Sequence, residues 1–287
     1  LGGVGVSLFL ILSGILAGLT DVSRNANYLT YMLKKTLRIY PLYWMSVPVA
    51  VLGYYMGDIL LRGNIPTLFP NGIAVDLLGS ITGMYAWAGM WGGPYNSPSW
   101  YIGLIMAMYA LFPVVLFAMK RNPHVTILIL LIISVVARYF VGQKGVPLVD
   151  TNLFEDIEGW VYRQFGFMPG RPGDWFPPCR IFEFGLGVYL ALVLPRALWF
   201  SLPALQSKPI QFLSDLSFPL FLVHHPYLFT IIYLNTKGLP LSFSILLFLA
   251  FMFYVSHLLN NVDKRFPRRK IMAFLIGENS SNQKISG

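Results

Sequence analysis

The chain has 287 residues, of which 56% are hydrophobic and only 11% are charged, and its mean hydropathy is +0.62. This composition excludes an ordinary soluble domain and is typical of a membrane protein with several spans. Lysine and arginine outnumber aspartate and glutamate by 21 to 12, which in such a protein indicates basic inner-face loops rather than nucleic-acid binding. The single cysteine, Cys179, excludes an intrachain disulfide and a cysteine metal cluster.

Seven apolar runs are long enough, or nearly so, to cross a membrane, and the sequence therefore predicts an all-α polytopic bundle with about seven visible spans. In chain order they cover residues 4–19, 39–55, 99–119, 125–141, 181–194, 213–234 and 239–259. Pro41 lies near the start of the second run, where we expect it in the first helical turn, because its missing N–H has no helical partner there. The chain begins at Leu1 inside an apolar run, and we expect a further helix before it.

Residues 72–91 are apolar and aromatic but contain Asp76 and several glycines. If this segment crossed the membrane, Lys120, Arg121 and the basic C-terminal end would lie outside, against the positive-inside rule. We therefore expect a re-entrant or interfacial segment with its backbone buried in protein. The basic clusters and the C-terminus are then cytoplasmic, and the acidic loop at 150–158 is external. The spacing of the acidic residues in that loop fits no metal-binding loop, so we expect no metal.

A basic cluster formed by Lys34, Lys35 and Arg38 runs directly into the aromatic second span. Lys35 and Arg38 are three residues apart, so that on a helix they share a face. An arginine fork beside a lysine point charge suits a phosphate group. Anchoring of the span by inner-face charge explains the same residues equally well at this point.

Five segments in a fixed order resemble motifs of the membrane-bound acyltransferase 3 family, the O-acyltransferases that modify sugars and surface polysaccharides. They are GVSLFLILSG at 5–14, KTLRIYPLYW at 35–44, a Trp-led helix from Ser99 through Tyr109 to Pro113, RIFEFGLG at 180–187 and LSFPLFLVH at 216–224. The order of the five matches is far more specific than any single match. Ser7 stands where the family usually has aspartate.

The resemblance implies transfer of an acyl group from cytoplasmic acyl-coenzyme A to a hydroxyl of a glycan or a lipid-linked acceptor. The implied donor-binding residues are Lys34, Lys35, Arg38 and Tyr40, and the implied acceptor-lining residues are Ser99, Trp100, Arg180, Glu183 and His224. The family's presumed catalytic histidine lies in a helix that would precede Leu1, which leaves His224 and Glu183 as the catalytic candidates in this chain. Arg180 and Glu183, at i and i+3, can also form a buried ion pair.

A second interpretation is a non-catalytic acyltransferase-like subunit packed in a larger membrane complex. The expected absence of the first helix favours it, as does the presence of Ile105 and Met106 where the family commonly has a pair of glutamates. The retained Lys35, Arg38 and Glu183 count against it. In either case we expect one transmembrane domain over residues 1–270 and a polar tail at 271–287. The expected location is a bacterial inner membrane, with lipid and no nucleic acid as partner.

Overall fold

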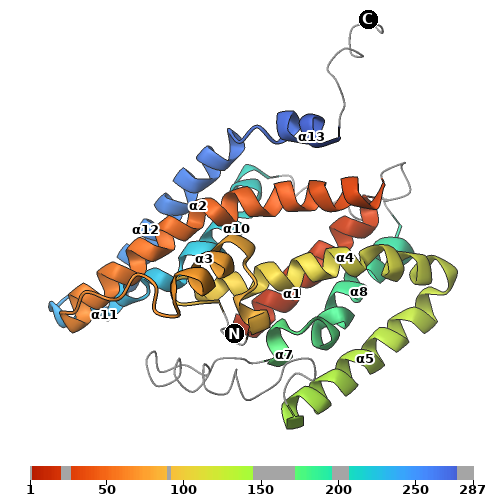
Figure 1. The fold of residues 1–287 in the computed structure, drawn as a ribbon, viewed down its shortest axis with the longest axis horizontal. Helices are drawn as coiled ribbons and strands as arrows, with labels where there is room; N and C mark the ends of the chain where they lie inside the picture. Colours follow the sequence, from red (N-terminus) through yellow and green to blue (C-terminus); the bar gives the residue numbers. More distant parts are fainter. Residues whose placement is uncertain (1, 21–26, 89–91, 145–171, 196–206, 277–287) are drawn as a thin grey trace, which may run out of the picture.

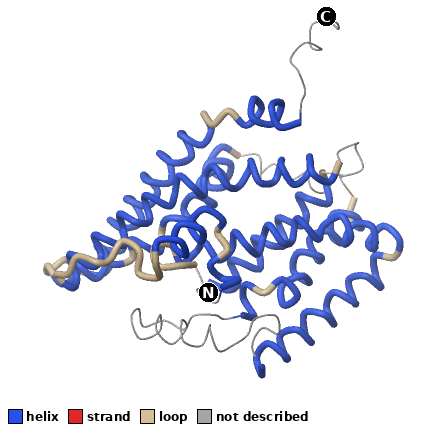
Figure 2. Tube along the Cα trace, in the orientation of Figure 1, coloured by secondary structure: helices blue, strands red, loops and turns tan. Residues whose placement is uncertain are grey.

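A computed structural model describes residues 2–20, 27–88, 92–144, 172–195 and 207–276. These residues form helices joined by turns and loops, with no strand among them (Figure 2), which confirms the all-α class. The helices are α1 (Gly2–Leu19), α2 (Tyr28–Arg62), α3 (Ile73–Thr82), η1 (Tyr85–Ala88), η2 (Ser97–Ser99), α4 (Trp100–Arg121), α5 (Pro123–Lys144), α7 (Pro172–Trp175), α8 (Pro177–Val193), α10 (Lys208–Val223), η4 (His225–Tyr227), α11 (Phe229–Thr236), α12 (Leu241–Lys264) and α13 (Arg268–Ile276). The acidic loop expected at 150–158 lies outside the described residues.

Five of the described helices are long and apolar enough to cross a membrane: α2, α4, α5, α12, and α8 taken together with α7. The run expected as one span at 213–234 is broken, because α10 and the η4–α11 segment meet at a bend of 62°. Pro226 lies in this break and lacks the N–H that a continuous helix needs. Counted as one span, the bent pair is the sixth. Helix α1, expected as a further span, is apolar but shorter than these.

Helix α2 is longer than its apolar run predicts. It begins at Tyr28, after the N-cap Asn27, and continues for 35 residues. The prediction that Pro41 lies in the first turn is wrong, since Pro41 is an interior residue. A proline at this position leaves the carbonyl of Leu37 without its helical donor. The guanidinium Nε of Arg268, at the start of α13, donates to that carbonyl at 2.9 Å, so a distant residue replaces the bond that the proline removes.

The described helix within the expected re-entrant or interfacial segment is too short to cross a membrane by itself. This helix, α3, has ten residues and rises about 15 Å, half of a hydrocarbon core of about 30 Å. Two aromatic side chains of α2 hold its C-terminal end: Tyr40 donates its O–H to the carbonyl of Thr82 at 2.6 Å, and Trp44 donates its N–H to that of Ile81 at 2.7 Å. These carbonyls lack helical partners, so α2 supplies the missing donors.

Helices α1 and α8 meet backbone to backbone in the middle of the bundle, while α5 lies at its outer edge (Figure 1). Gly14 faces Gly187 and Gly18 faces Ala191, a constant offset that makes the two helices parallel. Small residues four apart allow such an approach in membrane helices. Three described spans, α2, α4 and α5, lie between α1 and α8 in the chain. Two membrane-spanning helices run parallel only when an odd number of crossings lies between them. A fourth crossing at 72–91 would make them antiparallel.

Candidate functional site

The basic cluster is divided by the structure into an outward pair and an inward cation. Lys34 and Arg38, four residues apart on α2, are exposed. Lys35 is half-buried between α2 and α4, with its ammonium 4.5 Å from the ring centroid of Tyr109 and 5.4 Å from that of Tyr31. Such contacts stabilise a cation through the aromatic quadrupole. The described residues contribute no carboxylate to an ion pair with any of the three cations.

Tyr101 of α4 is the residue that connects the candidate side chains to one another. It is 5% exposed and makes ring contacts with Phe9 of α1 at 6.3 Å and Phe221 of α10 at 5.5 Å. Ser13 of α1 interacts with the hydroxyls of both Tyr101 and Tyr109. Tyr101 and Ser13 were not among the predicted site residues, although both lie inside motifs that carry the resemblance.

Arg180 and Glu183 form the ion pair that their spacing allows, and a second arginine joins it. Atom Oε1 of Glu183 lies 3.0 Å from Nη1 of Arg180 and 2.7 Å from Nη2 of Arg138 on α5. Arg180 is 4% exposed, and its Nη2 is 3.4 Å from the hydroxyl of Ser7. Within the described residues, Nε of Arg180 and Oε2 of Glu183 are buried without a hydrogen-bond partner. Two cations thus share one carboxylate: Arg180 pairs with it inside the bundle, and the half-exposed Arg138 reaches it from the surface.

His224 lies at the end of α10, where the helix bends. Its Nδ1 is 2.9 Å from the carbonyl oxygen of Phe221 and 3.2 Å from that of Leu220. Carbonyl oxygens only accept hydrogen bonds, so Nδ1 carries the proton and Nε2 is the basic nitrogen. The ring of His225 is 6.3 Å away and nearly perpendicular, as expected for neighbours that cannot share one ligand.

Three predicted site residues remain. Ser99 and Tyr40 donate hydrogen bonds to backbone carbonyls, and Trp100 packs against Tyr101. The hydroxyl of Ser99 donates to the carbonyl of Gly92 at 2.7 Å, and that of Tyr40 is used in binding α3. The Trp100 ring makes an edge-on contact with Tyr101 at 6.1 Å. The structure therefore brings Trp100 and Arg180 close to Tyr101, and it places Tyr40 against α3 and Ser99 against the loop that follows η1.

The α3 segment is itself fixed by a buried polar network. Asp76 accepts hydrogen bonds from the backbone N–H and the side-chain amide of Asn71, at 3.0 and 2.9 Å. Tyr85 donates its hydroxyl to the backbone carbonyl of Asp76 at 2.6 Å, and burial raises the pKa of Tyr85, so that its hydroxyl stays a donor. Among the described residues, no group of three histidine, cysteine or acidic side chains could hold a metal ion.

Comparison with known proteins gives two matches. A family model described as an acyltransferase domain matches residues 1–200. The acyltransferase MdmB of Streptomyces mycarofaciens is 27% identical over 220 residues, which cover 69% of this chain and 48% of MdmB. The chain thus spans about half the length of this relative. No solved structure matches.

Proposed function

Because the chain belongs to the acyltransferase 3 family, we propose that it transfers an acyl group from acyl-coenzyme A to a hydroxyl of a glycan or a lipid-linked acceptor. The new ester C–O bond forms as the thioester C–S bond breaks. The hydroxyl proton passes to a base, and coenzyme A leaves as the thiol.

The observation that carries this proposal is the outward pair Lys34 and Arg38 beside the inward Lys35. A guanidinium fork and an ammonium four residues apart on one helix face match the phosphates of coenzyme A. Between Arg38 and the end of α2 at Arg62 there are 24 residues, or about 36 Å of helix. That length covers a hydrocarbon core of about 30 Å and leaves the cluster at a membrane surface, within reach of a water-soluble donor.

The positive-inside rule makes that surface the cytoplasmic one, with the C-terminus on the same side, in a bacterial inner membrane. Docking of α13 supports the last point, since Arg268 bonds to the carbonyl of Leu37 within the basic cluster. The donor site and the C-terminal basic end therefore face the same compartment.

Among the described residues, His224 is the one suited to accept the proton of the acceptor hydroxyl, since its Nδ1 donates to the backbone and its Nε2 is the nitrogen that can accept. Glu183 suits a different task. Two guanidinium groups bind its Oε1, which leaves the buried Oε2 to accept a hydrogen bond from a substrate hydroxyl. We assign Glu183 and Arg180 to acceptor positioning and His224 to proton transfer.

Binding of radiolabelled acetyl-coenzyme A to the purified protein tests the donor site. The Lys34→Ala, Arg38→Ala double variant is expected to bind at least about tenfold more weakly, because two charge-assisted contacts to phosphate are lost. The matched control is Lys120→Ala, Arg121→Ala, which removes the same charge from the end of α4 and is expected to bind normally. Equal affinities in all three proteins would refute the phosphate site. Binding without turnover by the intact protein would favour the non-catalytic subunit.

A further inference from the structure

Helix α13 follows directly on a membrane span. Its nine residues come after α12, whose last residue is Lys264. With 24 residues, α12 rises about 36 Å, which covers a hydrocarbon core of about 30 Å. The end of α12 therefore lies at a membrane surface. The three residues between the two helices can take the start of α13 no more than about 14 Å from that end.

The first turn of α13 is fixed to the bundle by Arg268. Its Nε donates to the carbonyl of Leu37 at 2.9 Å, its Nη1 donates to the carbonyl of Asp263 at 2.7 Å, and its Nη2 pairs with the Asp263 carboxylate. Figure 1 shows α13 leaving the line of α12 on the side of α2. These bonds hold α13 close to the surface at which α12 ends.

The junction of α12 and α13 carries strong positive charge. Five of the seven residues from Lys264 to Lys270 are lysine or arginine, and no acidic residue occurs between Lys264 and Ile276. Two of the five pair with aspartates. Among the described residues, no ion pair includes the other three, which are exposed: Arg265, Arg269 and Lys270. A basic cluster directly after a span attracts the anionic head groups of the adjacent leaflet.

The second half of α13 adds an exposed apolar face. Phe274 is 84% exposed and Leu275 is 51% exposed. Together with Ile271 they occupy positions i, i+3 and i+4, which share one face of a helix. At about 100° per residue, Arg269 lies on the opposite side of the helix and Lys270 at the border of the apolar face. A short helix with this division, an aromatic apolar face and a basic polar one, is typical of helices that lie in the head-group region of a membrane.

An anionic lipid surface is the partner that satisfies both faces of α13. A soluble phosphate compound would use the cations and leave the ring of Phe274 in water. A neutral bilayer would take up that ring and gain little from three cations. Lipid head groups are present within about 14 Å of the start of α13 at all times, which no soluble partner matches.

We propose that α13 docks on the adjacent membrane leaflet and binds its anionic phospholipids, with Arg265, Arg269 and Lys270 at the phosphates and Phe274 among the upper parts of the acyl chains. The stem of Lys270 can lie along the apolar face while its ammonium extends to the head groups. This interaction surface does not depend on acyl transfer. Since Arg268 bonds to Leu37, the docked helix lies next to the basic cluster of α2.

A fluorescent probe on α13 tests the docking. Cys179 is the free cysteine, so a Cys179→Ala, Phe274→Cys variant of the full chain takes a nitrobenzoxadiazole label at position 274 alone. The labelled protein is placed in nanodiscs whose lipids carry a doxyl quencher high on the acyl chain. Quenching is expected to be at least about threefold stronger in equal parts of phosphatidylglycerol and phosphatidylcholine than in phosphatidylcholine, because each basic residue at an anionic surface contributes a factor of about five to binding.

Charge variants of the labelled protein identify the cations that act. Arg269→Gln, Lys270→Gln should require at least about threefold more phosphatidylglycerol for half-maximal quenching. The matched control, Lys120→Gln, Arg121→Gln, removes the same charge from the end of α4 and should leave the titration unchanged. Coenzyme A or inorganic phosphate added to phosphatidylcholine nanodiscs should cause no quenching, which separates lipid from soluble phosphate.

Three results would overturn the proposal. Absence of quenching in both lipids would show that α13 does not lie on the membrane, and equal quenching in both would show that it has no preference for anionic lipid. Equal titrations with and without Arg269→Gln, Lys270→Gln would exclude these cations as the lipid contacts. Thermal unfolding verifies that each variant is folded, and Leu275→Cys, on the same face, replaces Phe274→Cys if that variant is misfolded.

Discussion

Two of the glycine contacts between helices in this molecule differ in what the glycine faces. In the α1–α8 contact, a Cβ atom on Gly14 would overlap the carbonyl group of Phe184, and one on Gly187 would overlap that of Ile11. In the contact of α2 with η4 and α11, a Cβ atom on Gly57 would meet only the side chain of Phe229. The first contact joins two backbones. At Gly57 the second joins a backbone to a movable side chain, whereas at Gly53 of the same contact a Cβ atom would meet Pro226 and the ring of Tyr227.

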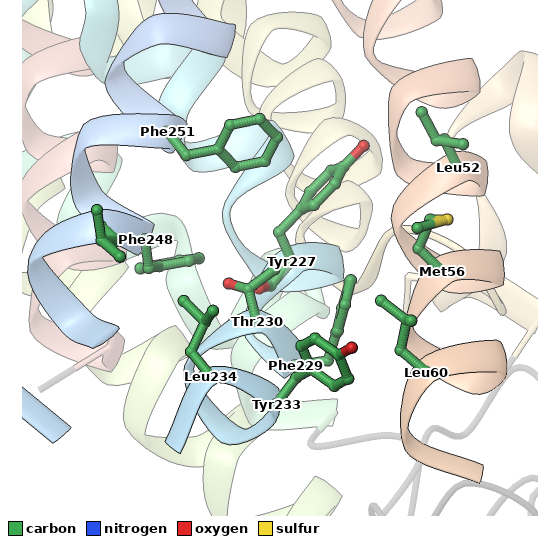
Figure 3. A pocket seen from close by; sticks show the side chains of 11 residues that line it. Leu52, Met56, Leu60, Tyr227, Phe229, Thr230, Tyr233, Leu234, Phe248 and Phe251 are labelled. Carbon is green, nitrogen blue, oxygen red and sulfur yellow. The ribbon is translucent and has the colours of Figure 1, made fainter. Parts of the chain in front are cut away.

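The difference shows where a membrane bundle can hold a ligand. Backbone contact leaves no space and fixes the relative height of two helices. It thereby holds Ser7 against Arg180, seven residues before each of the facing glycines. Side-chain contact keeps α11 and α2 apart on both flanks of Phe229, where two open cavities of about 540 and 220 Å³ lie, the larger of them shown in Figure 3. The α1–α8 contact supports the buried charges, and the contact of α2 with η4 and α11 leaves the space for the cavities.

Alanine at one glycine of each contact gives the largest expected contrast. Gly187→Ala should cost about 3 kcal/mol or more of unfolding free energy, since two backbones must separate. Gly57→Ala should cost about 1 kcal/mol or less, because the Phe229 ring can turn toward a cavity. Thermal unfolding in detergent measures both. Gly5→Ala is the control: nothing lies within 4 Å of its Cβ position, and alanine favours the helix. Similar losses at Gly187 and Gly57 would invalidate the comparison.

The charges beside the rigid contact give the next largest effect. Arg180→Ala should cost about 3 kcal/mol, because it removes the buried partner of Glu183. Arg138→Ala should cost about 1 kcal/mol or less, since its side chain is 46% exposed. Ser7→Asp should stabilise the protein, because a second carboxylate then faces the buried guanidinium of Arg180. The unfolding midpoints should therefore rank Ser7→Asp above wild type and Arg180→Ala lowest; the reverse order for the two arginines would contradict this account of the burial.

The sequence predicted the class of fold and most helices because apolar runs of this length have one stable state in a membrane. The charges on either side of residues 72–91 favoured a segment that does not cross, and the described helix α3 within it is too short to be a span by itself. It misplaced the start of α2, because the partner that compensates Pro41 is Arg268, more than two hundred residues away. No local pattern contains that contact.

The candidate site, like the fold, was only partly predictable from the sequence. Arg180 and Glu183 are close in sequence, so their pairing was foreseeable. The third member, Arg138, comes from another helix. Lys35 turns inward because Tyr109 of α4 lies beside it, and nothing within α2 indicates this. The cavities were not foreseen either, since they depend on how Phe229 sits on Gly57.

The contact of α13 with α2 provides the smallest and most specific test. This contact contains hydrogen bonds of Arg268 and no glycine. Arg268→Ala should cost about 1 kcal/mol, the usual worth of a hydrogen bond. In a Pro41→Ala background the restored N–H can satisfy the carbonyl of Leu37, so Arg268→Ala should cost measurably less. Pro48→Ala, which changes the other interior proline of α2, should leave the cost of Arg268→Ala unchanged.

Additive effects of Pro41→Ala and Arg268→Ala would show that the carbonyl gains nothing from the arginine. A coupling of about 0.5 to 1 kcal/mol would show that α2 depends on the C-terminal helix for its continuity, whereas close backbone packing and the contact of Ser7 with Arg180 join α1 to α8.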